Sequence, residues 1–290
     1  MPASKKRKPN PAKISGMPGL TATVVPTRRQ REAYAGSTPV DVCRADLGAA
    51  NAIMADRSFG IRPNDLIAQA YRALAQSPLC VDAYLALSEE IRDFDQSVDY
   101  LRRGVNAGAL ALGGLSAADA LFWAHSEGWR YLEARVRLAD AQLSTQEDAA
   151  IAELRSLLAF DPTDRICARY VLLQALLNQD DVEPARELLA AYADDRSTAW
   201  LYGRLLVGYR EEQRAGSAVT GLMLEALAAN PHVPDVFAKL MGIDDEDGRD
   251  PGSPGEALRY DFEYGQRWDD EPGALDWLIA LAASTRAAQP

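Results

Sequence analysis

The sequence predicts an all-α protein, an α-solenoid in which antiparallel helix pairs stack side by side behind a disordered N-terminal tail. Two observations lead to this fold class. Apolar residues recur three and four positions apart in three successive segments between residues 147 and 192, and a turn follows each segment. Nowhere is an alternating β-branched run flanked by turn signals, so no strand is expected. Because no helix can bury its own apolar stripe, successive helices must pack in pairs, as in a helical-repeat array.

In the first half of the chain, helices are expected where a cap or a proline precedes an apolar stripe. Pro63-Asn64-Asp65 opens the first clear helix, and Ser77-Pro78 stops it. Gly113-Gly114 breaks a long helix, after which Ser116 is placed to cap the next one. The helices expected here span residues 63–76, 81–91, 94–111, 117–125 and 131–143.

The same signals recur in the second half. Asp161-Pro162 ends one helix, and Asp164 is placed to cap its successor. Ser197 is placed to cap a later helix, and Asn230-Pro231 stops the partner of that helix. The expected elements are residues 147–160, a helix capped by Asp164, residues 182–192, 197–210 and 215–229, a short helix near 236–240, and residues 255–268 and 272–284.

These elements divide the 290-residue chain into four expected regions. Residues 1–60 are expected to be a largely disordered basic tail, because six prolines interrupt them and few large apolar groups are available for a core. The sequence leaves open whether a short amphipathic segment at residues 42–54 docks on the folded body. The other regions are helical repeats at residues 61–240, an acidic Gly/Pro loop at 241–254 and a C-terminal helical hairpin at 255–290.

Charge is distributed unevenly along the chain. Residues 1–44 carry nine Lys or Arg and two acidic residues, a net charge of +7, which leaves −18 for the rest of a chain whose total is −11. A body this acidic repels nucleic acid, so nucleic acid is expected to bind, if at all, only through Lys5-Lys6-Arg7-Lys8. The alternative is that this short basic run is simply a solvated tail.

Cysteine usage and hydropathy indicate the compartment. The odd number of scattered cysteines argues against a disulfide framework, and Cys80 and Cys167 are expected to pack on apolar helix faces. No apolar stretch of secretory-signal length follows the basic N-terminus. The longest apolar run, near residues 107–112, is far shorter than the ~20 residues that span a bilayer. We therefore expect a cytoplasmic protein without a membrane segment. A separate observation concerns the source: the bias toward Arg and Ala is typical of GC-rich bacterial genomes.

Several motifs resemble those of a known repeat. The opening of a second repeat helix is matched by residues 93–98 and again by residues 181–186. The aromatic, leucine and small positions of a first repeat helix are matched by Tyr84, Leu87 and Ser88. These motifs resemble the tetratricopeptide repeat, and four such repeats cover about residues 64–231. The resemblance implies an α-solenoid in which the first helix of each pair lines a concave groove.

A second resemblance extends over about residues 64–280. It rests on Phe122-Trp123, Trp129-Arg130-Tyr131, Asp161-Pro162, Tyr170-Val171-Leu172-Leu173, Ala199-Trp200, Asn230-Pro231-His232-Val233-Pro234 and Pro272-Gly273-Ala274-Leu275-Asp276-Trp277-Leu278. These motifs are similar to those of the bacterial relatives of the suppressor of tumorigenicity seven family. That resemblance implies a tetratricopeptide-like fold and an interaction role, and it implies no particular reaction.

Tests for catalytic and metal motifs find none in the sequence. His125 and His232 stand far apart, no cysteine pair has zinc spacing, and no phosphate-binding glycine loop or Gly-x-Ser-x-Gly elbow occurs. An EF-hand centred on Gly248 would need acidic residues where Ile243 and Pro254 stand. We therefore expect no cofactor, no metal and no enzyme activity. The competing hypothesis is an enzyme with its site near residues 260–277.

The remaining prediction is a binding surface. The resemblance to tetratricopeptide arrays places six polar or aromatic side chains in the concave groove: Glu133, Arg137, Arg169, Tyr170, Trp200 and Arg204. Arginine binds carboxylates with two hydrogen bonds, and Tyr and Trp supply rigid contact area. The alternative for Trp129, Tyr170 and Trp200 is packing between helices.

The predicted function is thus a scaffold or adaptor that binds a peptide or protein partner in this groove. The alternative function is a nucleic-acid- or ribosome-associated adaptor that uses the basic tail.

Overall fold

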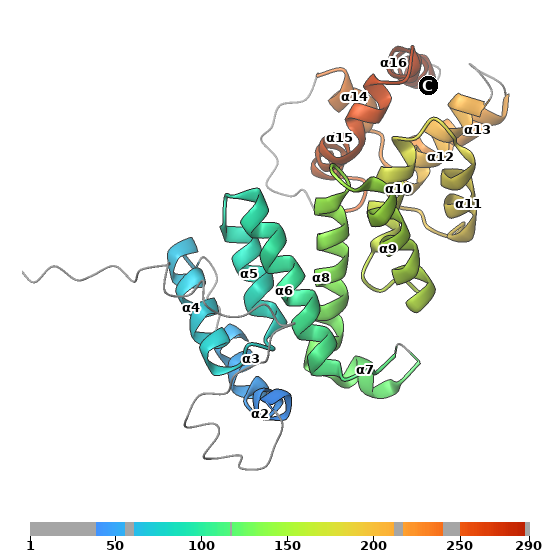
Figure 1. The fold of residues 1–290 in the computed structure, drawn as a ribbon. Coiled ribbons are helices and arrows are strands. Elements are labelled where there is room, and N and C mark those ends of the chain that lie inside the picture. Colours follow the sequence, from blue (N-terminus) through green and yellow to red (C-terminus); the bar gives the residue numbers. More distant parts are fainter. Residues whose placement is uncertain (1–38, 56–60, 117, 212–216, 240–249, 288–290) are drawn as a thin grey trace, which may run out of the picture. The chain divides into compact units, whose positions relative to one another are not determined.

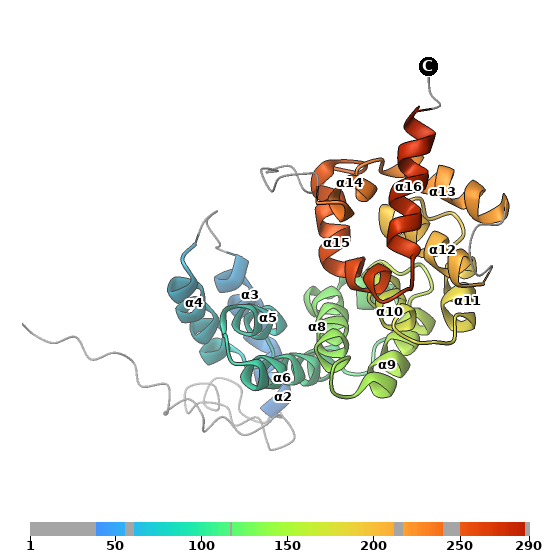
Figure 2. The ribbon, with the colours of Figure 1, turned by 90° about the horizontal axis from the view of Figure 1, so that it is seen from above.

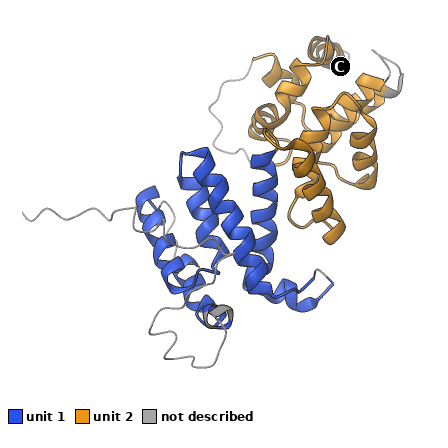
Figure 3. Cartoon of the chain, viewed as in Figure 1, with its two compact units in different colours: residues 1–142 blue, residues 143–290 orange. Residues whose placement is uncertain are grey.

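The computed structural model describes residues 39–55, 61–116, 118–211, 217–239 and 250–287. These residues are mostly helical and contain no strand, so the all-α prediction is confirmed for them (Figure 1). The chain divides into two compact units, unit 1 (residues 1–142) and unit 2 (residues 143–290), shown in Figure 3. Each unit is described by itself.

Unit 1 is a stack of consecutively packed helices. Each helix from α3 to α5 packs on the next one, and α6 packs on α8. In addition α5 contacts both α3 and α8, so these three helices form one row, which we call the α3–α5–α8 row. The helices are α2 (Pro39–Ala45), α3 (Leu47–Ala55), α4 (Pro63–Gln76), α5 (Val81–Glu90), α6 (Phe94–Leu112), α7 (Ala120–Ala124) and α8 (Ser126–Gln142).

Residues 39–55 belong to the folded body, which answers the question that the sequence left open about residues 42–54. Helices α2 and α3 bury Cys43, Leu47 and Met54 in the core of unit 1. The Ser77 hydroxyl donates to the Cys43 carbonyl oxygen at 2.8 Å, which fixes α2 against the end of α4. The sequence left this question open because tertiary packing, which stabilises short helices, leaves little periodic signal in so short a segment. The rest of the predicted tail lies outside the described residues.

The start of α8 also corrects the sequence analysis. Ser116 does not cap a helix, because its amide and hydroxyl groups both donate to the Asp119 carboxylate, at 2.8 and 2.9 Å, and α7 begins only afterwards. His125 Nδ1 accepts the Glu127 amide at 3.1 Å, so this histidine caps α8. The helix begins at Ser126, five residues before the expected start at residue 131. Burial lowers the pKa of His125, and the charge of Arg44 lowers it further, which favours the neutral, accepting form.

Unit 2 begins as a similar stack. Consecutive helices from α9 to α13 pack on one another, and α10 also contacts α12, so these two form a row. The C-terminal helices then return, because α15 packs on α14 and on both members of the α10–α12 row (Figure 2). The helices are α9 (Glu147–Phe160), α10 (Ala168–Leu177), α11 (Glu183–Ala191), α12 (Thr198–Glu211), α13 (Ser217–Ala229), α14 (Val233–Phe237), α15 (Pro254–Asp269) and α16 (Ala274–Ala287).

An aromatic cluster attaches α15 to the α10–α12 row. Tyr264 donates its hydroxyl hydrogen to the Tyr170 carbonyl oxygen at 3.1 Å. The rings of Tyr260 and Tyr202 lie 5.4 Å apart, and Trp268 Nε1 donates to the Tyr260 hydroxyl at 2.9 Å. Because these rings are buried, α15 is part of the core of unit 2. The predicted C-terminal hairpin corresponds to α15 and α16, and most of the predicted acidic loop, residues 241–249, lies outside the described residues.

Candidate functional site

The structure places the six predicted groove residues in two groups. Glu133 and Arg137 lie on α8 in unit 1. The other four lie in unit 2, with Arg169 and Tyr170 on α10 and Trp200 and Arg204 on α12.

Arg169 is held inside a network of unit 2. Its Nε donates to Asp195 Oδ2 at 2.9 Å, its Nη1 donates to Asp164 Oδ2 at 3.0 Å, and its Nη2 donates to the Tyr170 hydroxyl at 3.1 Å. The guanidinium carbon also lies 4.6 Å from the ring centroid of Tyr170 and 5.1 Å from that of Tyr192. Only 17% of this side chain is exposed. Its hydrogen-bonding groups are therefore already directed inward.

The two carboxylates of this network are held by the backbone as well. Asp164 accepts the amides of Ala168 and Arg169 at 2.7 and 3.1 Å. Its carboxylate thus satisfies the first amides of α10, although Cys167 and not Asp164 occupies the N-cap position. Burial raises the pKa of Asp164, against the effect of those amides and of Arg169. Desolvation also acts to raise the pKa of Asp195, but hydrogen bonds from Ser197, Tyr170 and Arg169 outweigh it and lower that pKa.

Cys167 is exposed, which corrects the prediction that it packs in the core. It occupies the turn between Asp164 and Ala168 with a left-handed backbone, φ 61°, instead of lying on the apolar face of α10. The sequence analysis placed it on a helix because the helix was expected to begin soon after its cap.

Trp200 is completely buried, in agreement with the alternative that it packs between helices. Its Nε1 donates to the Leu189 carbonyl oxygen at 3.3 Å, and its ring meets those of Tyr170 and Tyr192 edge to face. Arg204 remains at the surface of a cavity of about 390 Å³ between α11, α12 and α13. Of the four predicted residues in unit 2, Trp200 and Arg169 thus serve the packing of the unit.

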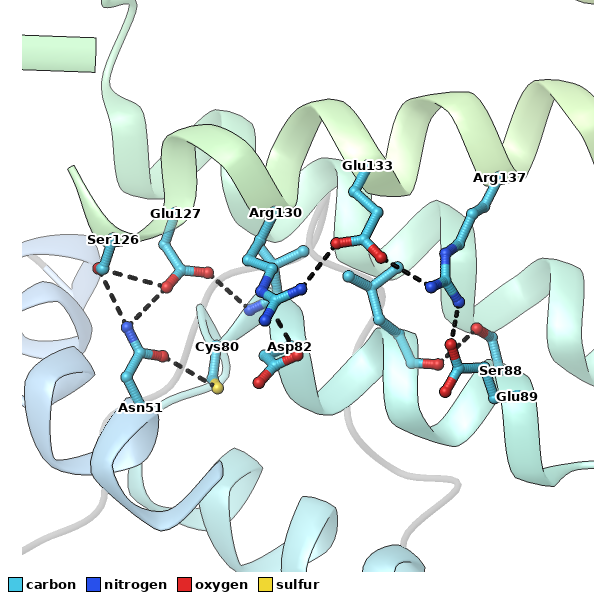
Figure 4. Close-up of polar contacts among 12 residues, drawn as sticks. Asn51, Cys80, Asp82, Ser88, Glu89, Ser126, Glu127, Arg130, Glu133 and Arg137 are labelled. Carbon is cyan, nitrogen blue, oxygen red and sulfur yellow. Dashed lines mark hydrogen bonds and ion pairs between the residues drawn. The ribbon is translucent and has the colours of Figure 1, made fainter. Parts of the chain in front are cut away.

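The α3–α5–α8 row of unit 1 carries a different polar surface. Four charged residues of α8 follow one another at spacings of three, three and four, which places them on one helix face: Glu127, Arg130, Glu133 and Arg137 (Figure 4). Figure 4 shows these side chains pointing toward α5 and α3.

Acidic and basic groups alternate along this face, in a set that we call the charge ladder: Asp82, Arg130, Glu133, Arg137 and Glu89. Arg130 Nη1 donates to Glu133 Oε2 at 2.8 Å, and Arg137 Nη2 donates to Glu133 Oε1 at 2.7 Å. Arg137 also pairs with Glu89 on α5, and Arg130 Nε lies 3.6 Å from Asp82 Oδ1. The exposed fractions of these side chains run from 17% for Asp82 to 46% for Glu89, so the ladder is partly exposed.

The ladder ends at a buried carboxylate. Glu127 is 1% exposed and accepts the Val81 amide at 2.8 Å and Asn51 Nδ2 at 2.7 Å. Burial raises the pKa of Glu127, and the hydrogen bonds from Val81 and Asn51 oppose that rise. Cys80 Sγ donates to Asn51 Oδ1 at 3.2 Å, and burial raises the pKa of this thiol to about 12. Cys80 is therefore a buried thiol, as predicted.

A cavity of about 330 Å³ opens beside Glu127. Its volume lies at the lower end of the range for ligand sites, which suits one side chain of a bound chain. The lining residues come from all three helices of the row: Asn51, Met54, Ala55, Asp82, Ser126, Glu127 and Arg130.

Sequence reasoning found part of this site. Glu133 and Arg137 are among the predicted residues, but Asp82, Glu89 and Arg130 are not. The sequence does not show which residues of α5 lie opposite which residues of α8. The spacing from Glu127 to Arg137 was a usable signal, yet it was hidden because α8 was expected to begin at residue 131.

Replacing Glu127 with alanine is expected to lower the free energy of unfolding by about 2–3 kcal/mol, because the buried Val81 amide and the Asn51 side chain lose their acceptor. Urea unfolding followed by circular dichroism measures the change. Glu90→Ala, at the partly exposed end of α5, is the control and should change the stability by less than about 0.5 kcal/mol. Equal effects in the two variants would contradict the role of Glu127 as the buried acceptor of the Val81 amide.

No described helix is both long enough and apolar enough to cross a lipid bilayer.

The comparisons with known proteins bear on neither the resemblance to the tetratricopeptide repeat nor that to the suppressor of tumorigenicity seven family. No family model matches the chain, and neither a curated protein nor a solved structure shows a significant match to it.

Proposed function

We propose that this chain is a protein–protein interaction scaffold built from tetratricopeptide-like repeats, and that the α3–α5–α8 row binds an extended polypeptide segment along its charge ladder. The pairwise packing of consecutive helices supports the repeat architecture. In the proposed repeat assignment, α3 and α5 are the first helices of the pairs α3–α4 and α5–α6, and α8 packs on α6 as the next first helix. First helices line the concave groove in such arrays.

The observation that carries this proposal is the contrast between the two charged networks. In unit 2, Arg169 is desolvated between carboxylates whose side chains are 0% and 8% exposed, so opening that network would leave buried charges without partners. In unit 1, the ladder is partly exposed, and ion pairs of that kind contribute only about 0–1 kcal/mol each. The ladder groups can therefore exchange partners with a ligand at little cost.

The chemistry of the ladder suits a peptide backbone. Each guanidinium offers five N–H donors in a fixed plane, and each carboxylate offers several acceptor positions. Alternation of the two kinds along one face presents donors and acceptors in turn, as the carbonyl and amide groups of an extended peptide require. The cavity beside Glu127 then accepts one side chain and sets the register of the bound segment.

The test is a selection of short random peptides displayed on phage against the full chain, followed by fluorescence anisotropy of the selected sequences. The paired substitution Glu133→Ala with Arg137→Ala should weaken binding about tenfold or more, which corresponds to roughly 1.4 kcal/mol. The matched control is Glu183→Ala with Arg186→Ala, which removes the same two residue types from an exposed ion pair on α11.

The control pair should leave the affinity unchanged. The proposal is contradicted if selection yields no specific peptide, or if both pairs of substitutions weaken binding equally. The alternative of a nucleic-acid adaptor depends on Lys5–Lys8, which lie outside the described residues.

A further inference from the structure

We propose that the charge ladder takes a basic segment, and that residues 5–13 of this same chain occupy it in the free protein. This inference rests on the proposed function, since it names the ligand class and the regulation of the same surface. It is argued from the charge of the ladder, from the geometry of its cavity and from the part of the chain that precedes α2.

The ladder and the carboxylate at its end carry more negative than positive charge. Four carboxylates, those of Asp82, Glu89, Glu127 and Glu133, surround two guanidinium groups. The surplus of two negative charges favours a ligand with Lys or Arg side chains over an acidic one.

The cavity offers a specific place for one such side chain. Arg130 Nε lies 3.6 Å from Asp82 Oδ1, which is longer than a hydrogen bond, although the two form an ion pair. Asp82 also lines the cavity, which places its carboxylate within reach of an incoming ammonium group. Glu127 also lines this cavity, and its carboxylate is fixed by the Val81 amide and by Asn51.

The complementary segment is part of the same chain. Residues 5–13 contain Lys5, Lys6, Arg7, Lys8 and Lys13 and no acidic residue, in a chain whose net charge is −11. The chain enters unit 1 at Pro39, where α2 contacts α3 and α6. The 31 residues from Lys8 to Pro39 span at most ~100 Å, whereas the 17-residue α8 is only ~25 Å long, so the connection does not limit access.

Tethering explains why individually weak ion pairs are sufficient. A segment attached to the same chain binds as an intramolecular ligand, at an effective concentration of the order of millimolar. A partner that uses the ladder must then displace residues 5–13, so its own binding segment has to be basic and must make more contacts than the tail makes.

The test is carbodiimide cross-linking of the full chain, which joins a lysine amine to a carboxylate that lies in contact with it. Links are mapped by mass spectrometry. We expect links from Lys5, Lys6, Lys8 or Lys13 to Asp82, and we expect them to disappear at about 0.5 M NaCl, where the Debye length is only a few ångström. A mixture of ¹⁴N- and ¹⁵N-labelled protein identifies links within one chain.

Two charge-matched variants isolate the ladder. Glu89→Gln with Glu133→Gln should reduce the yield of the links to Asp82 about fivefold, because the ladder loses two carboxylates that attract the basic tail. Asp82 itself is retained in this variant. Asp65→Asn with Asp95→Asn removes the same charge from exposed positions on α4 and α6 and should leave those links unchanged. Circular dichroism confirms that each variant is folded.

Three outcomes would overturn the inference. The tail could be linked equally to Asp65, Asp95 and Asp82, or all links could join differently labelled chains. The third outcome is that no tail lysine is linked to the ladder while the chain binds a fluorescent single-stranded RNA. The last would favour the nucleic-acid function. Failure of the proposed function is a separate result. If selected peptides bind but no tail link forms, only the inference about residues 5–13 is contradicted. If tail links form but no peptide is selected, only the proposed binding of a separate partner is contradicted.

Discussion

Replacing Arg169 with alanine is expected to lower the free energy of unfolding by about 3–5 kcal/mol, one of the two largest effects that we predict. The guanidinium group bridges Asp164 and Asp195, whose side chains are almost fully buried. Removing one partner of a buried ion pair leaves uncompensated charge in a poorly solvated site. It also removes the cation that lies against the rings of Tyr170 and Tyr192. Urea unfolding followed by tryptophan fluorescence and circular dichroism measures the loss.

Arg196→Ala is the matched control for this prediction. Arg196 pairs with Glu225 at 3.3 Å, but its side chain is 69% exposed, so its removal should change the stability by less than about 1 kcal/mol. Similar losses in the two variants would mean that the buried network does not stabilise unit 2. If the Arg169→Ala protein is as stable as the unsubstituted chain but no longer binds the selected peptides, Arg169 is a peptide-binding residue, as the sequence predicted.

Trp200→Ala is expected to destabilise the protein by a similar amount, about 3–5 kcal/mol, because it removes a completely buried indole and leaves a cavity among Leu189, Tyr170 and Tyr192. The measurement is again the free energy of unfolding, read by circular dichroism so that the loss of one fluorophore does not affect the signal.

Trp129 provides the comparison, since it is 46% exposed and makes a single edge-to-face contact with Trp123 at 6.5 Å between ring centroids. Trp129→Ala should cost less than about 1.5 kcal/mol, the upper value for such an aromatic pair. A Trp200→Ala protein as stable as Trp129→Ala would show that the packing around Trp200 is not as described.

The long periodic helices could be predicted from the sequence almost to the residue. The spans expected at residues 63–76 and 147–160 are those of α4 and α9. Both have an apolar stripe and a terminating Ser-Pro or Asp-Pro pair, so local signals and burial agree. Where local signals are weak, the sequence leaves the structure open. The segment at residues 39–55 is short and has no such terminator, so only its packing against α4 and α6 makes it helical.

The site was less accessible to sequence reasoning for a related reason. Helical spacing tells which residues of α8 share a face, but it does not tell which carboxylates on α5 face Arg130 and Arg137. Those pairs depend on the register between two helices, which is set by side-chain packing. The same limit applies to Trp200, because its aromatic character suits a groove and a core equally well, and only the position of α11 decides between them.

The return of α15 onto the α10–α12 row has a consequence for how this chain can evolve. Repeat proteins commonly lengthen by duplicating a helix pair, since every pair offers the same surface to its successor. Here a duplicated α12–α13 pair would present α15 with two copies of the surface around Tyr202, although Tyr260 and Trp268 can engage only one of them. The helix therefore fixes the number of helix pairs at this end, and changes of length should be tolerated only where no later segment folds back.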